Sequence, residues 1–149
     1  MIRHIENSFK VFTDGSCWPN PGNKGGWAYI IKDYSGVLIN KSAKAYLAEN
    51  VTNNKMELMA AIEGLKFFSE PKIIELITDS EYLGKGITTW MHQWKKTGWK
   101  QKNGDLWKEI YELVNYHTVY VTCIRGHQGQ EENEECDKMA SEVVKCLNI

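Results

Sequence analysis

The chain lacks features that would place it in the membrane or in a metal-thiolate class. No segment of its 149 residues approaches the roughly 20 consecutive apolar residues that span a bilayer, and the stretch from Met1 to Glu6 has no apolar signal core. The cysteines contain no C-x-x-C pair, which argues against zinc ligands and disulfides. We therefore expect a soluble cytoplasmic protein that acts as a monomer and has no membrane partner.

Cysteine is scarce, with four residues in the whole chain. Three of the four fall inside apolar strand or helix patterns, where small buried thiols are common. We interpret the set as reduced packing residues: Cys17, Cys123, Cys136 and Cys146.

Excess charge of either sign is also absent, because the net charge is −1. This balance neither favours nor excludes a nucleic-acid partner. The distribution of charged residues along the chain is therefore the more informative evidence on such a partner. With 42% hydrophobic residues, the chain can bury one sizeable core but is too short for two ordinary domains. We expect a single domain over residues 1–149.

The hydrophobic periodicity predicts an α/β protein. A meander of three strands is followed by a helix, a strand, two helices, a strand and a last helix. This order favours a mixed sheet with helices on both faces, in which ligands gather at the carboxyl ends of strands. The predicted strands are 9–13, 27–31, 37–46, 73–78 and 119–124, and the predicted helices are 56–68, 87–96, 105–114 and 133–147.

Four acids occupy positions that need an explanation. Asp14 and Asp79 each follow a predicted strand, whereas Glu57 and Asp137 interrupt the apolar faces of predicted helices. Taken one at a time, each acid has an ordinary explanation. Asp14 can be a turn residue, Asp79 can be an N-cap, and the two helix acids can be partly exposed at helix borders. Jointly, a common site is favoured, because a buried carboxylate is costly unless it is paired or bound to a metal. Oxygen ligands of this kind suit magnesium first and manganese second.

An oxygen-only site that substrate phosphates complete suggests phosphoryl transfer. Two ions about 3.5–4 Å apart activate water on one side of a phosphodiester and stabilise the leaving oxygen on the other. His127, between two glycines, has two interpretations. It is either a solvated loop histidine or a mobile imidazole that accepts a proton from the attacking water.

Several long motifs resemble those of type 1 ribonuclease H of the bacterial kind. The resemblance runs in order from Phe9 to about Val144, nearly the whole chain. The motifs are Phe12-Thr13-Asp14-Gly15-Ser16-Cys17, Asn20-Pro21-Gly22, the stretch from Thr52 to Ala61, Thr78-Asp79-Ser80, and Gly126-His127 followed by the stretch from Asn133 to Asp137.

The resemblance implies the ribonuclease H fold, with a five-stranded mixed sheet flanked by helices. It implies an endonuclease that cuts the RNA strand of RNA–DNA hybrids and leaves 5′-phosphate and 3′-hydroxyl ends. It also implies two magnesium ions held by Asp14, Glu57, Asp79 and Asp137, with His127 as the assisting base.

Substrate-binding roles follow from the same resemblance. Thr52 and Asn103 are expected in a DNA-phosphate pocket, although Asn103 read alone is a turn residue and Asn53 a plausible helix cap. The residues expected on the ribose and minor-groove side are Gly15, Cys17, Asn20, Asn53 and Glu57.

The stretch from Lys85 to Lys102 contains no acid and is both basic and aromatic. One interpretation is a lysine-solvated helix with tryptophans in the core. The resemblance favours a surface that binds the DNA strand. The residues assigned to it are Trp90, Trp94, Lys95, Lys96, Trp99 and Lys100.

Three departures from the family pattern bear on binding. The segment from Lys100 to Gly104 is shorter than usual, Asn50 stands where an arginine is common, and Glu81 replaces a usual glutamine. Two other classes compete with an independent enzyme: a ribonuclease H domain of a reverse transcriptase, and a binding module without catalysis. The second would lack one or more metal carboxylates, and all four are present.

Overall fold

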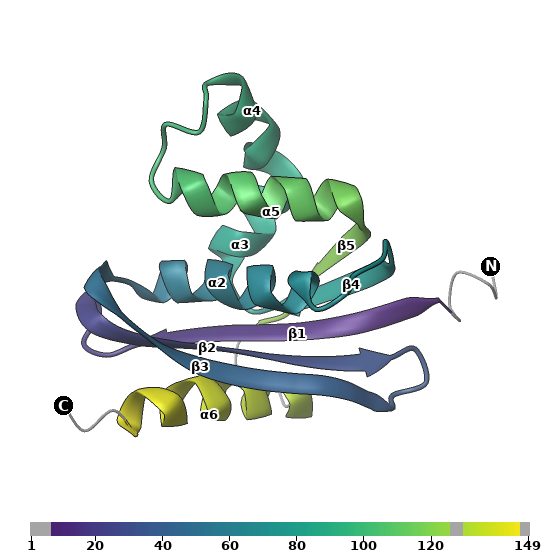
Figure 1. The fold of residues 1–149 in the computed structure, drawn as a ribbon, viewed down its shortest axis with the longest axis horizontal. Coiled ribbons are helices and arrows are strands. Elements are labelled where there is room, and N and C mark those ends of the chain that lie inside the picture. Colours follow the sequence, from purple (N-terminus) through teal and green to yellow (C-terminus); the bar gives the residue numbers. More distant parts are fainter. Residues whose placement is uncertain (1–6, 126–129, 147–149) are drawn as a thin grey trace.

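Five strands form one mixed sheet in the order β3-β2-β1-β4-β5 (Figure 1). The structure is a computed structural model that describes residues 7–125 and 130–146. Strands β1 to β3 pair antiparallel, and β4 and β5 continue the sheet parallel to β1. The strands are β1 (Ser8–Cys17), β2 (Gly22–Asp33), β3 (Leu38–Val51), β4 (Ile73–Thr78) and β5 (Thr118–Cys123).

Helices cover both faces of the sheet, which confirms the predicted fold class. Helix α6 lies alone on one face, whereas α2 lies on the other with α3 and α5 beyond it (Figure 1). The helical elements are α2 (Asn53–Lys66), α3 (Glu81–Lys85), the π-helical turn η1 (Gly86–Trp90), α4 (Met91–Lys96), α5 (Gly104–Tyr116) and α6 (Glu131–Lys145).

Alternation along β1 divides the core into two layers. Val11 faces the larger core under α2, which also contains Leu58, Leu76 and Trp107. Its neighbour Phe12 faces the smaller core under α6. Successive strand residues point to opposite faces, so one strand holds both helical layers in register.

Strand β1 is longer than predicted. The sequence placed a turn at Asp14, but the strand continues to Cys17, and Asp14 pairs with Ala28 of β2. Gly15 serves close packing here, because a Cβ at this position would lie 2.4 Å from the backbone nitrogen of Glu57. The glycine therefore allows α2 to approach the strand.

The helix boundaries follow side-chain caps. The sequence offers an N-cap at Thr52 or Asn53, and it is Thr52 that caps α2, its Oγ1 accepting from the Lys55 N–H at 3.1 Å. Ser80 caps α3 by accepting from the Leu83 N–H, so helical structure starts at Glu81, earlier than the predicted residue 87. Helix α5 starts at Gly104, one residue before the predicted start, so Asp105 lies in its first turn and does not cap it.

The packing interpretation holds for two of the cysteines. Cys17 and Cys136 are buried, but Cys123 and Cys146 are exposed, so that interpretation was wrong for the latter pair. All four thiols are free. Among the described residues, no helix combines the length and the apolar character needed to cross a bilayer.

The buried His117 joins α2 to the segment before β4 through two hydrogen bonds. Its Nδ1 accepts from the Lys72 N–H at 3.0 Å, and its Nε2 lies 3.0 Å from the Leu65 carbonyl oxygen. Since a carbonyl oxygen only accepts, Nε2 carries the proton. Burial lowers the pKa of His117 from its usual 6.5, so the fold holds the neutral ring.

Replacing His117 with alanine should destabilise the protein most at neutral pH. The change leaves the Lys72 N–H and the Leu65 carbonyl unpaired, at a cost of about 2–3 kcal/mol in unfolding free energy. Below about pH 6.5 the unfolded wild type takes up a proton more readily than the folded state, so the wild type loses stability. The difference in unfolding free energy between the wild type and the variant therefore becomes smaller. Urea unfolding at pH 7.5 and 5.5 measures both effects, with the exposed His92→Ala as control. An equal difference at the two pH values would contradict the neutral assignment.

Candidate metal centre

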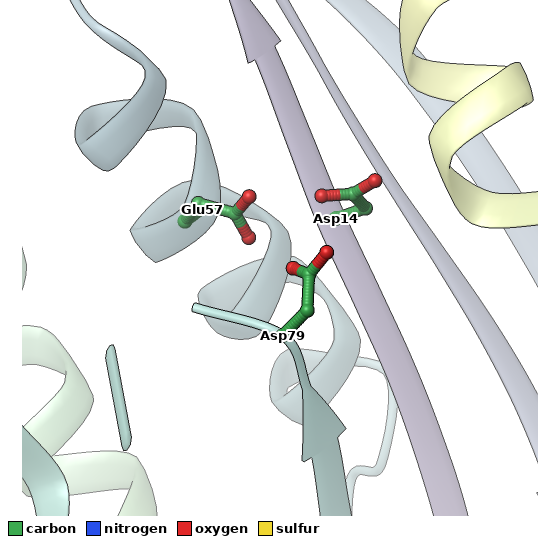
Figure 2. Close-up of side chains that lie close together, drawn as sticks. All are labelled: Asp14, Glu57 and Asp79. Atoms are coloured by element: carbon green, nitrogen blue, oxygen red, sulfur yellow. The ribbon is translucent and has the colours of Figure 1, made fainter. Parts of the chain in front are cut away.

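Three carboxylates from different elements meet at one edge of the sheet. Asp14 comes from β1, Glu57 from α2, and Asp79 directly follows β4. One ligand oxygen of each lies within 4.8 Å of the others, and the side chains point toward one another (Figure 2). The structure therefore brings together three of the four acids that the sequence singled out.

Backbone geometry explains this convergence. Strands β1 and β4 are parallel neighbours, so their carboxyl ends reach the same edge. Glu57 reaches that edge from α2, because Gly15 lets the backbone of the helix lie close to β1. The acids are thus positioned by strand pairing and helix packing, and not by a flexible loop.

The site is unfavourable for negative charge. The pKa of Asp14 is raised to about 7, chiefly by burial and also by the charges of Asp79 and Asp137, while a hydrogen bond with Glu57 opposes the shift. Burial and the neighbouring Asp14 raise the pKa of Glu57 well above its usual range. Two adjacent buried carboxyl groups therefore tend to retain protons in the absence of a cation.

An orphaned oxygen shows that the residues suit a divalent cation. Oε2 of Glu57 is buried and has no hydrogen-bond partner among the described residues. An unpartnered buried carboxylate oxygen is costly unless a cation or a donor meets it. A set of oxygen donors matches the preference of hard divalent ions, so the cluster could hold a metal ion.

Asp137 differs from its predicted environment. It lies on α6 outside the group of three, and it is exposed, whereas Cys136 and Ala140 on the same helix are buried. The expectation that it interrupts the buried helix face was therefore wrong. Its charge raises the pKa of Asp14, which indicates that Asp137 lies near the cluster. His127 lies outside the described residues.

A hydrogen-bonded network adjoins the acids on the α2 side. The Asn53 Oδ1 accepts from the Cys17 N–H at 2.7 Å, and the Asn53 N–H donates to Oδ1 of Asn20 at 3.1 Å. The buried Cys17 thiol donates to the Val51 carbonyl. Asn53 is thus no helix cap, a role that Thr52 fills, but a link between β1 and the following loop.

A polar pocket of about 670 Å³ opens beside this network. Thr52 lines it, but Asn103 does not, because the Asn103 amide donates to the Tyr82 hydroxyl at 3.2 Å. Lys102 lines the pocket instead. The sequence placed both residues in one polar bend, and nothing in the pattern indicates which side chain turns inward.

The basic, aromatic stretch from Lys85 to Lys102 contributes residues both to the core and to the surface. Trp94 and Trp99 pack against the main core, as the alternative interpretation held, whereas Trp90 is 38% exposed. Lys95 donates to the Tyr111 hydroxyl at 3.1 Å and lies 4.7 Å from the centre of that ring. All three predicted lysines are exposed, and Lys96 and Lys100 are the freer ones because only Lys95 of the three makes such a contact with a described residue.

Comparisons with known proteins agree on one protein family. A protein-family model described as RNase H matches residues 6–145. The chain is 45% identical over 139 residues to a ribonuclease H from Tolumonas auensis, covering 87% of this chain and 85% of that protein.

Solved structures share the fold. The structure of LC9-RNase H1, described as a type 1 RNase H with the type 2 active-site motif, has a TM-score of 0.80 and 28% identity, covering 94% of this chain and 73% of that one. The structure of LC11-RNase H1 in complex with an RNA/DNA hybrid has a TM-score of 0.70 and 20% identity, covering 93% and 97%.

Asp14→Asn should stabilise the protein when divalent metal is absent. The folded pKa of about 7 exceeds the usual 3.8, so the folded state binds more protons and the wild type loses stability as pH rises through that window. At pH 8 the variant should gain about 1–3 kcal/mol in unfolding free energy, because each pKa unit corresponds to about 1.4 kcal/mol. Thermal unfolding in a chelator at pH 4.5 and 8 measures this, with the exposed Asp105→Asn as control. A variant that is less stable than wild type at pH 8 would contradict the electrostatic account.

Proposed function

The chain belongs to the ribonuclease H family, and we propose that its carboxylate cluster cuts the RNA strand of RNA–DNA hybrids endonucleolytically, leaving 5′-phosphate and 3′-hydroxyl ends. The convergence of Asp14, Glu57 and Asp79 carries this proposal. The family match over residues 6–145 includes all three positions. The hybrid-bound relative with the same fold supports the choice of substrate.

Two magnesium ions are the proposed cofactors, with manganese as a substitute. Asp14, Glu57 and Asp79 would hold them, joined by Asp137 from α6. The ions would supply an activated water and neutralise charge on the leaving 3′-oxygen. The orphaned Oε2 of Glu57 supports a ligand role for this residue, because a cation is the partner that it lacks.

Other residues of the chain would position the substrate and move a proton. Gly15 directly follows Asp14, and Cys17, Asn20 and Asn53 form the hydrogen-bonded network on the α2 side; these four residues would contact the RNA strand. The 2′-hydroxyl, both donor and acceptor, is what distinguishes RNA from DNA at such a site. His127 is proposed as the base that accepts the proton of the attacking water.

Asp79→Asn should abolish most of the cleavage while the fold stays intact. The substitution removes one ligand charge and nearly preserves shape, so turnover should fall by on the order of 10³-fold, corresponding to several kcal/mol of lost charge stabilisation. Initial rates on a labelled RNA–DNA hybrid, with and without magnesium, measure the loss. Circular dichroism and thermal unfolding show whether the variant is folded.

The same assay separates this function from its alternatives. Glu142→Gln, which removes an exposed acid of α6, is the matched control and should cleave at the wild-type rate. Wild-type protein should cut the hybrid but neither double-stranded RNA nor double-stranded DNA, and only with a divalent ion. Near-normal turnover by folded Asp79→Asn, or equal cutting of all three duplexes, would refute the proposal.

A further inference from the structure

We propose that two ion pairs between the sheet and α6, Lys32–Glu132 and Lys41–Glu135, set the position of Asp137 beside the acid cluster. The inference rests on the proposed function, since it takes Asp137 to be a ligand of the magnesium ions. The four paired side chains are then positioning residues, which act on the metal site only through Asp137.

Asp137 depends on the placement of one helix. The other three acids belong to β1, α2 and the end of β4, whereas Asp137 comes from α6 and lies outside their group. It is exposed, yet close enough to the cluster for its charge to act on the Asp14 carboxyl. The way in which α6 lies on the sheet therefore decides how far Asp137 is from the other acids.

The packing of α6 fixes its height above the sheet better than its rotation. The helix lies on the face opposite α2 (Figure 1), and a Cβ on Gly26 of β2 would be 2.3 Å from the Ala140 carbonyl oxygen. The buried stripe of α6 consists of Asn133, Cys136, Ala140 and Val144. Such small side chains make few interlocking contacts, so they resist rotation of the helix about its axis only weakly.

Two ion pairs add a restraint to the N-terminal half of α6. Nζ of Lys32 in β2 lies 3.2 Å from Oε2 of Glu132, and Nζ of Lys41 in β3 lies 2.9 Å from Oε2 of Glu135. Lys41 pairs in the sheet with Ile30, two residues before Lys32, so both lysines lie on the same face. The two glutamates are three residues apart and share one side of the helix.

The paired glutamates and Asp137 lie on opposite flanks of the buried stripe. Each residue is turned by about 100° around the helix axis relative to the one before it. Glu132 and Glu135 therefore lie on one flank, and Asp137 lies on the other. Because the helix turns as a unit, rotation cannot move Asp137 relative to Asp14 without changing both lysine–glutamate distances. The pairs on the side of β2 and β3 thus restrain Asp137 on the other side.

The ion pairs are better suited to positioning than to stabilising the fold. The side chains of Lys32 and Glu132 are 28% and 22% exposed, and those of Lys41 and Glu135 are 49% and 43% exposed. Partly exposed pairs of this kind add little to the free energy of unfolding. A small bias still affects a metal site, since the apparent Kd rises as the population of the binding-competent state falls.

Removing both pairs without changing the net charge should weaken magnesium binding. In Lys32→Met/Lys41→Met/Glu132→Gln/Glu135→Gln, the magnesium Kd from calorimetric titration of substrate-free protein should rise about two- to fivefold. Excess magnesium should select the aligned helix, so turnover on an RNA–DNA hybrid at saturating magnesium should stay near the wild-type value. Exchanging the charges within each pair should keep the Kd close to that of the wild type.

Matched variants control for folding and for the loss of an ion pair elsewhere. Lys66→Met/Glu109→Gln removes an ion pair between α2 and α5 and should bind magnesium like the wild type. Circular dichroism and urea unfolding show whether each variant is folded. Two double variants, each lacking one pair, give the same comparison in smaller steps if the quadruple variant does not fold.

A background without Asp137 separates positioning from a general effect on the fold. Asp137→Asn should itself raise the magnesium Kd, and removing the ion pairs in that background should raise it no further. A further rise in the Asp137→Asn background would overturn the proposal. An equal rise in the Lys66/Glu109 control would overturn it as well.

The two levels of the proposal fail in different ways. If wild-type protein cleaves the hybrid and removal of both pairs leaves the magnesium Kd unchanged, the positioning role is wrong and the proposed function stands. If wild-type protein binds magnesium but does not cleave the hybrid, and the pairs alter the Kd only when Asp137 is present, the proposed function fails and the positioning role stands.

Discussion

Buried negative charge at the junction of β1, α2 and β4 is the constraint on which this structure depends. Two carboxyl groups, those of Asp14 and Glu57, are removed from water beside each other, and Asp79 adds a third. Burial alone disfavours their ionised forms, and their proximity adds repulsion. A fold gains no stability from such a cluster unless protons or a cation neutralise it. The cluster is therefore better explained by function than by packing.

Helix α2 connects this cluster to the polar pocket beside it. Gly15 lets the helix approach β1, so that Glu57 reaches Asp14. One turn earlier, Asn53 bonds to both Cys17 and the loop residue Asn20 and lines the polar pocket. A single helix thus fixes the distance between the acid cluster and the polar pocket. Such positioning on regular elements is what precise phosphoryl transfer requires.

Much of this arrangement could be predicted from the sequence because its signals are local. The apolar run of β4, the Thr52 cap of α2 and the strand-end position of Asp79 all depend on neighbouring residues. The predictions failed where contacts between residues distant in the sequence determine the structure. Gly15 appeared to be a turn residue because its true role, contact with α2, is tertiary. The choice between Lys102 and Asn103 at the pocket depends on the Tyr82 hydroxyl, 21 residues away from Asn103.

Proton release on metal binding tests the central claim most directly. In the metal-free protein the pKa of Asp14 is raised to about 7 and that of Glu57 lies well above its usual range, so these carboxyl groups retain protons near neutral pH and must lose them to become ligands. Calorimetric titration with magnesium in two buffers of different ionisation enthalpy counts the protons. Our account predicts net proton release when magnesium binds at pH 7, with weaker magnesium binding below pH 7. Magnesium binding without proton release, or unchanged in affinity between pH 6 and pH 8, would contradict it.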